Sequence, residues 1–502
     1  MSIAASALEI AADRPLLIPL FSAAMLVVLA DWLFYGWQVG ISLALFFGVL
    51  GVVAVAGNRA RATRRLQLIM AAIFLSGLLT LIEHVNTLSV IMGAQATALF
   101  VTVTTARQGS SWQRYLFEAV TVPIRSPFRL AGDVFSALHP MKIWTPGWLG
   151  SLVAWIIPVT VFAVFLALFA SANPLIEHQL NRIDLRFLFN HLDPRRIAFW
   201  ILVVCVIWSL IRRRAAQREP VRTLEPAAAG VVEPSKPDGL LGVKAVSRSL
   251  VLFNALFALQ TGLDLTYLWG GAKLPDGMSY AEYAHRGAYP LIATALLAAG
   301  FALVAMRPGG PARQSRLIRP LVLLWIGQNI LLVISSIFRL DLYVAAYSLT
   351  YLRLAAFIWM GLVAVGLLLM LVQIGLKKPN SWLITANAVS LALALYGCCF
   401  LNMPWLIASY NVEHCREVGG TGPNLDLQYL GSLGPQALSA LEPHRKNVPA
   451  LVIDLDLRFP GLRDSVAHSR NWRAWCFRTW RLERYLANNP GTTPNPSDSS
   501  KG

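Results

Sequence analysis

The chain carries little charge for its length. Only 14% of its 502 residues are Asp, Glu, Lys or Arg, whereas soluble proteins carry about 25%. Hydrophobic residues make up 56%, and the mean hydropathy is +0.56. A water-soluble fold cannot bury that much apolar surface, so the composition excludes an ordinary soluble protein.

Cysteines and catalytic motifs are also scarce. The sequence has no nucleotide-binding loop, no Gly-x-Ser-x-Gly elbow, no His-Glu-x-x-His and no paired-cysteine metal spacing. Its net charge of +17 comes from arginines set between apolar runs, whereas nucleic-acid-binding proteins gather basic residues on a polar domain. We therefore expect no nucleic-acid partner and no cofactor, and an enzyme is the less favoured class. Five cysteines are too few and too scattered for a disulfide scaffold: Cys205, Cys398, Cys399, Cys415 and Cys476.

Apolar runs of helical length dominate what is present. A spanning helix needs about 20 apolar residues, and the pattern predicts an all-α polytopic transmembrane helix bundle of about 11 spans with a small helical extramembrane C-terminal domain. The expected spans are Pro15 to Ala30 (a retained signal anchor), Val39 to Ala56, Leu66 to Ile82, Thr87 to Val103, Trp148 to Ala170, Ile197 to Ile211, Leu250 to Gly270, Ala288 to Met306, Pro320 to Phe338, Leu352 to Gly375 and Trp382 to Phe400.

Composition shifts divide the chain into five parts. They are an N-terminal membrane region of about six spans (1–211), a basic, Pro-rich linker (212–248), a C-terminal membrane region of about five spans (249–401), an extramembrane helical tail domain (402–487) and a disordered end (488–502). Within the first region, residues 104–147 mix arginines with aromatics, which suits a helix lying among lipid headgroups. The alternative is a solvated loop with one helix packed on the bundle.

Basic residues gather in alternate connections between the spans, and the positive-inside rule then places the N terminus in the cytoplasm. An odd number of spans sends the tail to the opposite side, which in a bacterium would be the periplasm. In that oxidising compartment Cys415 and Cys476 could form a disulfide, although pairing depends on a distance that sequence does not give.

A candidate polar site falls in the second membrane region. Its members are Asp264, Glu282, His285, Arg286, Arg339, Asp341 and Arg353. An aspartate deep in a bilayer costs roughly 2.5 to 3.5 kcal/mol on insertion scales, so Asp264 needs a partner. Gln260, Arg286 or protonation would offset that cost, and an interhelical ion pair is favoured over a proton or ion relay.

The remaining site residues allow several uses. If residues 279–286 are helical, Glu282, His285 and Arg286 share one face. Glu282 and His285 supply only two metal ligands, and a third would have to come from Asp264 or Asp341, so we expect a salt bridge and no metal. Arg339, Asp341 and Arg353 lie on the same expected outer side among tyrosines. They suit an anionic headgroup or sugar, or act as snorkelling membrane anchors.

Several long segments resemble one known family. They are Asn254 to Gln260, Asp264, Tyr267 to Gly271, Tyr280 to Pro290, Arg339 to Arg353 and Ala355 to Met360. These segments resemble a bacterial multi-pass inner-membrane family catalogued as domain of unknown function 4173, or its sister 4153. The resemblance implies a multi-pass membrane protein and brings no activity, substrate, cofactor or catalytic residue.

Three functions remain open, in this order. The first is a non-enzymatic envelope protein, sensory or scaffolding, whose tail meets an envelope protein or an anionic lipid in addition to the bilayer. The second is a transporter with an outward-facing polar site around Asp264, Glu282 and Arg286. The third is an envelope enzyme acting on lipid or glycan at the outer leaflet, with Glu282 or Asp264 as general base and Arg339 or Arg353 on a phosphate.

Overall fold

The computed structural model describes residues 17–106, 112–144, 162, 193–213, 243–270, 297, 318–444 and 471–489. It is 86% helical, and the described residues contain no strand, which confirms the all-α class. The chain divides into two compact units. Unit 1 comprises residues 1–217 with 471–476, and unit 2 comprises residues 218–470 with 477–502. The division after residue 217 falls within the predicted linker.

Eight described helices are long and apolar enough to cross a membrane, and α2 is a shorter apolar helix. These nine coincide with nine of the expected spans. The other two, 148–170 and 288–306, lie almost wholly outside the described residues. The total of about 11 spans therefore stays a prediction, while the multi-spanning character is confirmed.

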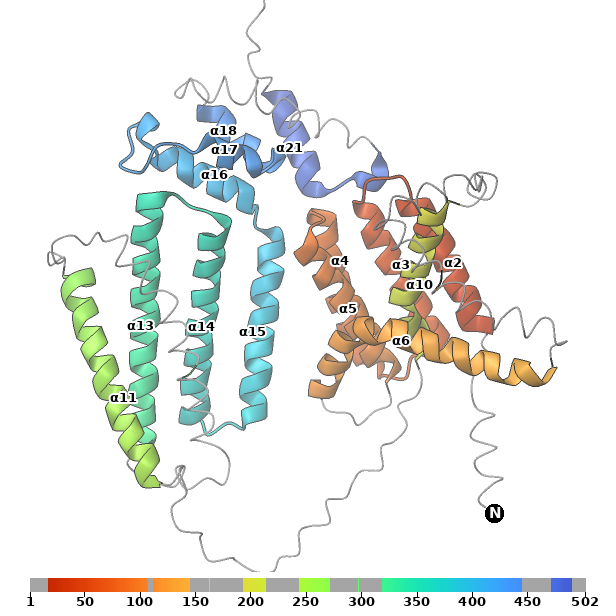
Figure 1. The fold of residues 1–502 in the computed structure, drawn as a ribbon, viewed down its shortest axis with the longest axis horizontal. Helices are drawn as coiled ribbons and strands as arrows, with labels where there is room; N and C mark the ends of the chain where they lie inside the picture. The colour runs from red at the N-terminus through yellow and green to blue at the C-terminus, as the bar shows by residue number, and fades with distance from the viewer. Residues whose placement is uncertain are drawn as a thin grey trace, which may run out of the picture. The chain divides into compact units, whose positions relative to one another are not determined.

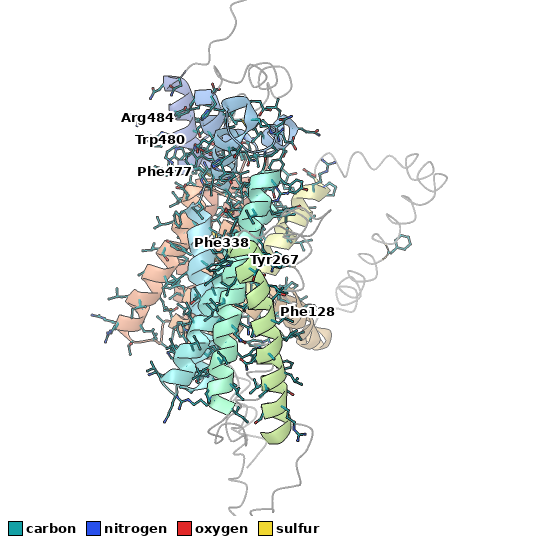
Figure 2. All side chains as sticks on the ribbon, turned by 90° about the vertical axis from the view of Figure 1, so that its left-hand side faces the viewer. Phe128, Tyr267, Phe338, Phe477, Trp480 and Arg484 are labelled. Atoms are coloured by element: carbon teal, nitrogen blue, oxygen red, sulfur yellow. The ribbon has the colours of Figure 1, made fainter. Side chains whose placement is uncertain are left out.

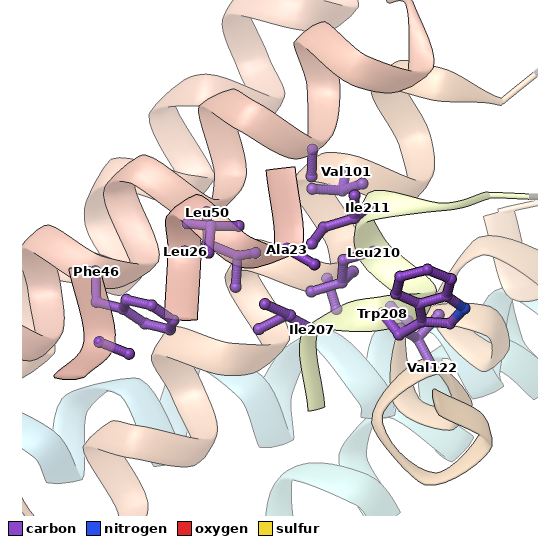
Figure 3. Packing of buried hydrophobic residues seen from close by; sticks show 14 of the residues in the cluster. Ala23, Leu26, Phe46, Leu50, Val101, Val122, Ile207, Trp208, Leu210 and Ile211 are labelled. Carbon is purple, nitrogen blue, oxygen red and sulfur yellow. The ribbon is translucent and has the colours of Figure 1, made fainter. Parts of the chain in front are cut away.

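Unit 1 is a bundle of spanning helices crossed by one amphipathic helix. Its elements are α2 (Leu17–Phe34), α3 (Ile41–Asn58), α4 (Arg64–Glu83), α5 (Thr87–Thr105), α6 (Trp112–Trp144), α10 (Pro194–Ile211) and the short η6 (Trp472–Ala474). Local signals set the helix starts: Asn86 and Ser89 form a capping box at α5, and Asp193 caps α10 just before Pro194. Figure 3 shows the core, where Leu26, Leu50, Val101, Ile207 and Trp208 meet between the helices.

The ends of α3, α5 and α10 meet at one end of unit 1, which we call the basic end. The Asn58 amide donates to the carbonyls of Leu210 and Ile211, each at 2.9 Å, and the backbone amide of Arg61 donates to Thr104 at 2.8 Å. Six arginines cluster in these helix ends and the connection to α4: Arg59, Arg61, Arg64, Arg65, Arg212 and Arg213.

Residues 471–476 return to unit 1 and dock at the turn between α2 and α3. The first backbone amide of α3, that of Ile41, donates to the Trp475 carbonyl at 2.8 Å. The guanidinium carbon of Arg473 lies 4.7 Å from the Trp32 ring and 4.8 Å from the Trp37 ring. The segment is therefore held by a helix N-terminus and by cation–π contacts.

The described residues of unit 2 form four long helices that stand side by side and a group of short helices at one end (Figure 1). The long elements are α11 (Val243–Leu263), continued by the π-helical turn η1 (Asp264–Trp269), then α13 (Ile318–Tyr347), α14 (Tyr351–Gly375) and α15 (Asn380–Phe400). The short ones are α16 (Met403–His414), η3 (Arg416–Val418), α17 (Leu427–Ser432), η4 (Pro435–Ala437), α18 (Leu438–Leu441), η5 (Glu442–His444) and α21 (Phe477–Asn488).

Residues 403–444, which we call the cap, share one hydrophobic core with the end of α13. Val344 and Leu349 pack with Ile407 and Val412 of α16. The Asn411 side chain accepts a hydrogen bond from the Leu349 amide at 2.7 Å and donates to its carbonyl at 3.0 Å. The cap is thus packed on the end of the helix bundle.

Candidate functional site: a buried ion pair between two spanning helices

The site lies where α11 changes from α-helix to π-helix. Asp264 is the first residue of the π-helical turn and is 1% exposed. The backbone amide of Gly270 reaches the Leu265 carbonyl at 2.9 Å, five residues earlier, and closes the widened turn. Gln260, one turn before Asp264, donates to its Oδ1 at 3.0 Å. π-Helical turns inside α-helices recur at functional sites.

Arg339 of α13 supplies the counter-charge. Its side chain is 4% exposed, and its Nη2 donates to Oδ1 of Asp264 as a salt bridge. A ring contact at the same level, Trp269 edge-on to Phe338 with centroids 5.1 Å apart, packs η1 against α13; Phe338 and Tyr267 are labelled in Figure 2. Each of these charges alone would be costly in hydrocarbon, and the pair neutralises both. Its structural role is therefore to hold η1 against α13.

Uncharged polar side chains extend the same contact along the bundle. Asn254 of α11 donates to the carbonyl of Leu321 at 3.1 Å, and Gln328 of α13 donates back to the Asn254 carbonyl at 3.3 Å. α11 and α13 are therefore joined by polar contacts at two levels. Interhelical hydrogen bonds of this kind are typical stabilising contacts in membrane proteins.

The other described site residues have different surroundings. Arg353 donates from Nη1 to the Tyr347 carbonyl at 2.5 Å and to that of Ser348, and it lies 4.5 Å above the Tyr343 ring. It thereby holds the turn between α13 and α14, where Ser348 has a φ of 68°. Asp341 is exposed, two residues beyond Arg339 on α13.

Glu282, His285 and Arg286 lie outside the described residues. Their grouping with Asp264 stays a prediction. Among the residues that the structure describes, no three His, Cys, Asp or Glu side chains come close enough together to hold a metal ion.

A pocket that the sequence did not reveal lies between the end of α13 and the cap. Its volume is about 40 Å³, and its lining includes Val344, Tyr410, Asn411 and His414. The rings of Tyr410 and His414 stack with centroids 4.1 Å apart. Burial and the nearby Asp341 carboxylate raise the pKa of Tyr410. Ligand pockets typically measure about 300–1,000 Å³, so this one has room only for water or a single small group.

The sequence signal for this pocket was weak. Tyr410 and His414 are one helical turn apart, and Gly420 and Gly422 follow closely. A Cβ atom on Gly422 would lie 2.5 Å from the His414 carbonyl oxygen, so the loop needs glycine to fold back on α16. Neither feature distinguishes a pocket from a tight turn.

Cys415 and Cys476 are both buried, and their sulfurs are not in a disulfide in the structure. Cys415 belongs to unit 2, where its thiol donates to the Val412 carbonyl at 3.2 Å, and Cys476 belongs to unit 1. The pairing of these two cysteines therefore stays a prediction.

The fold and the buried ion pair define a polytopic α-helical membrane protein. The chain belongs to the family described as "Domain of unknown function (DUF4153)", whose profile matches residues 20–444. This confirms the resemblance to the sister family 4153. No curated protein and no solved structure matches the chain.

Proposed function

We propose that this protein is a non-enzymatic scaffold of the bacterial inner membrane, whose spanning helices carry the cap and α21 as a binding surface for an envelope partner. The observation that carries the proposal is the common core of the cap and α13. A cap built onto the ends of spanning helices holds a partner at a fixed position relative to the membrane. The same rigid connection would pass a change at the cap into the bundle, which is what a sensor requires.

Two features of the polar site support a scaffold. Asp264 and Arg339 are engaged with each other, and Arg353 is engaged with backbone carbonyls of its own turn. These groups stabilise helix contacts that are needed whether or not a ligand binds. Side chains that a partner could contact lie instead on α21, where Phe477 and Trp480 are exposed (Figure 2).

The exposed side of α21 suits a partner that accepts both apolar and cationic contacts. The rings of Phe477 and Trp480 stack with centroids 5.7 Å apart. Arg481 lies 5.1 Å from the Phe477 ring, and Arg484 lies 5.5 Å from that of Trp480. Aromatic and arginine side chains are the residues enriched at protein interfaces. An acidic envelope protein or anionic headgroups would match this surface.

Helix directions support a periplasmic cap. The basic end of unit 1 suits the cytoplasm by the positive-inside rule, and α10 ends there. The start of α13 lies beside the start of α11, since Ile318 and Leu321 pack with Val246 and Leu250. α13 then runs to the cap, so the cap lies at the end of unit 2 opposite to the start of α11. If α11 starts in the cytoplasm, the cap lies in the periplasm.

The test uses a deletion strain complemented with full-length variants and challenged with detergent and low osmolarity. Arg481→Gln with Arg484→Gln should lose complementation, because it removes the cations of the exposed surface without touching the core. The matched control, Lys377→Gln with Lys378→Gln, removes the same charge from the connection between α14 and α15 at the opposite end of the bundle and should complement.

The same complementation test is applied to a variant of the polar site, for comparison with the α21 variant. Asp264→Asn with Arg339→Gln, present at wild-type abundance, should also complement if the pair is structural. Failure of this double variant together with success of the α21 variant would overturn the scaffold.

The buried pair itself favours a second function, a transporter. An ionisable pair inside a spanning helix, placed at a π-helical turn, is also what a substrate or proton site looks like. Native mass spectrometry of the protein in lipid discs separates the two. A stoichiometric ion or small molecule bound to the wild type and lost from Asp264→Asn with Arg339→Gln would establish transport or lipid chemistry, and identical ligand-free masses would leave the pair structural.

A further inference from the structure

The longest described helix, α6, is not among those apolar enough to cross a membrane. With 33 residues, it extends about 50 Å at 1.5 Å per residue. It packs across α5 and α10 (Figure 1). One side of α6 packs on the last turn of α10: Ala119 and Val122 are buried there, and the Ser126 hydroxyl accepts the Ser209 backbone amide at 2.9 Å.

Both acidic residues of α6 point into unit 1. Asp133 forms a salt bridge with Arg212 at 2.8 Å and accepts the indole N–H of Trp208 at 2.9 Å. Glu118 forms a salt bridge with Arg213 at 2.7 Å. These contacts fix α6 at the basic end of unit 1. Both carboxylates of α6 are thus paired with arginines of that unit.

The opposite side of α6 carries an exposed apolar stripe. Phe117, Val120, Ile124 and Phe128 are 61%, 55%, 67% and 77% exposed. Their spacing of three, four and four residues places them on one helix face. Phe128 is labelled on α6 in Figure 2. Large apolar side chains in such a row do not stay in water without a cost of roughly 2 kcal/mol each.

Arginines lie along one side of this stripe. Arg125 and Arg129 are exposed, and Arg125 lies 5.6 Å from the Phe117 ring. Arg114, at the start of the helix, is 51% exposed and reaches Glu118 at 3.4 Å. The part of the chain that the structure describes places no carboxylate against Arg125 or Arg129. The outward charge of α6 is therefore entirely positive.

We propose that α6 lies in the plane of the membrane on an anionic leaflet, with its apolar stripe (Phe117, Val120, Ile124 and Phe128) at the boundary of headgroups and acyl chains and with Arg125 and Arg129 on lipid phosphates. Apolar side chains flanked by arginines are the pattern of interfacial helices. An anionic lipid surface matches both parts of the pattern, whereas a water-exposed helix matches neither. The proposal uses only contacts of unit 1 and stands independently of the scaffold function.

The first experiment tests what covers the stripe. The full-length protein is placed in lipid discs with equal phosphatidylglycerol and phosphatidylcholine, and p-benzoylphenylalanine replaces Phe128. Leu252, an exposed residue of a spanning helix, is the positive control, and Gln428, an exposed residue of the cap, is the negative one. Lipid adducts are expected at 128 and 252 and not at 428. An adduct to another protein or a second copy at 128, or none while 252 reacts, would overturn the proposal.

The second experiment tests the headgroup assignment by the ratio of phosphatidylglycerol to phosphatidylcholine adducts at position 128. Arg125→Gln with Arg129→Gln should lower it by roughly fivefold per arginine, up to about 25-fold. Lys377→Gln with Lys378→Gln removes equal charge elsewhere and should leave it unchanged. Both variants should keep the wild-type thermal midpoint, because all four side chains are exposed. An unchanged ratio in the arginine variant would show that these arginines do not bind the lipid phosphates.

Discussion

Removing one member of the Asp264–Arg339 pair is expected to destabilise unit 2 by about 3–5 kcal/mol. The side chains are 1% and 4% exposed, so the charge that remains cannot be hydrated where it lies. Asp264→Asn leaves the Arg339 guanidinium beside a neutral amide, and Arg339→Gln takes the guanidinium away from the Asp264 carboxylate. The double variant removes both charges and leaves neither one buried without its partner, so it should lose less than either single variant.

The chain offers a matched control in the Asp31–Arg196 pair. It also joins two apolar helices, α2 and α10, with Nε of Arg196 at 2.8 Å from Oδ1 of Asp31. Its side chains, however, are 15% exposed for Asp31 and 47% for Arg196. Water can replace the lost partner there, so Asp31→Asn should cost about 1 kcal/mol or less.

The measurement is reversible unfolding in mixed micelles, followed by circular dichroism as the fraction of sodium dodecyl sulfate rises. The expected order of loss is Asp264→Asn well above Asp31→Asn, with the double variant of Asp264 and Arg339 between them. Equal losses for Asp264→Asn and Asp31→Asn, or strict additivity in the double variant, would refute the reasoning.

Other predictions concern glycine packing, acid stability and the cap. Gly40→Ala would put a Cβ 2.3 Å from the Ala474 carbonyl carbon; hydrogen exchange of residues 471–476 should speed up, while Gly57→Ala, with open space around it, should leave it unchanged. Burial acts to raise the pKa of Glu417, but backbone hydrogen bonds outweigh burial and hold that pKa below 4.5. The ionised Glu417 side chain therefore stabilises the fold above pH 4.5, and this stabilisation is lost as the pH falls through the lower pKa of the folded state. Glu417→Gln should make the melting temperature less dependent on pH in the acid range. Asn411→Ala removes two hydrogen bonds between cap and bundle and should destabilise the cap by about 2–4 kcal/mol, measured by limited proteolysis of residues 403–444.

Helix ends were predictable where the sequence carries a capping signal. The expected span 87–103 corresponds to α5, which starts at Thr87 because Asn86 and Ser89 form the capping box. The expected span 352–375 corresponds to α14, where Thr350 accepts the Arg353 amide at the start. Such signals act within four residues, so a single sequence is enough to place them.

The end of α13 was not predictable in the same way. The apolar run suggests a span that stops at Phe338, because Arg339 and Asp341 follow it. The helix continues to Tyr347, since Arg339 is neutralised by Asp264, 75 residues earlier in the chain. A contact of that separation leaves no periodic signal, although the cost of an aspartate in hydrocarbon did require that Asp264 have some partner.

The packing of the tail shows the same limit. Polar composition after residue 402 predicts an extramembrane helical domain but does not indicate which residues bury α16. Val344 of α13 and Leu349 of the α13–α14 turn complete its buried face. The sequence of α16 shows apolar residues such as Ile407 and Val412, but it does not show which residues bury them.

Pairing of arginines with carboxylates separates structural from binding residues in this chain. Three arginines that are shielded from solvent each form a salt bridge with an acidic side chain of another helix: Arg339, Arg212 and Arg213. Their charges therefore stabilise contacts between helices. Arg125 and Arg129 are exposed, and the described residues bring no carboxylate to them. With 43 Lys and Arg against 26 Asp and Glu, internal ion pairs cannot balance the charge, and the surplus must be met by something outside the chain. We expect an anionic leaflet beside α6 to meet part of this surplus at the basic end of unit 1.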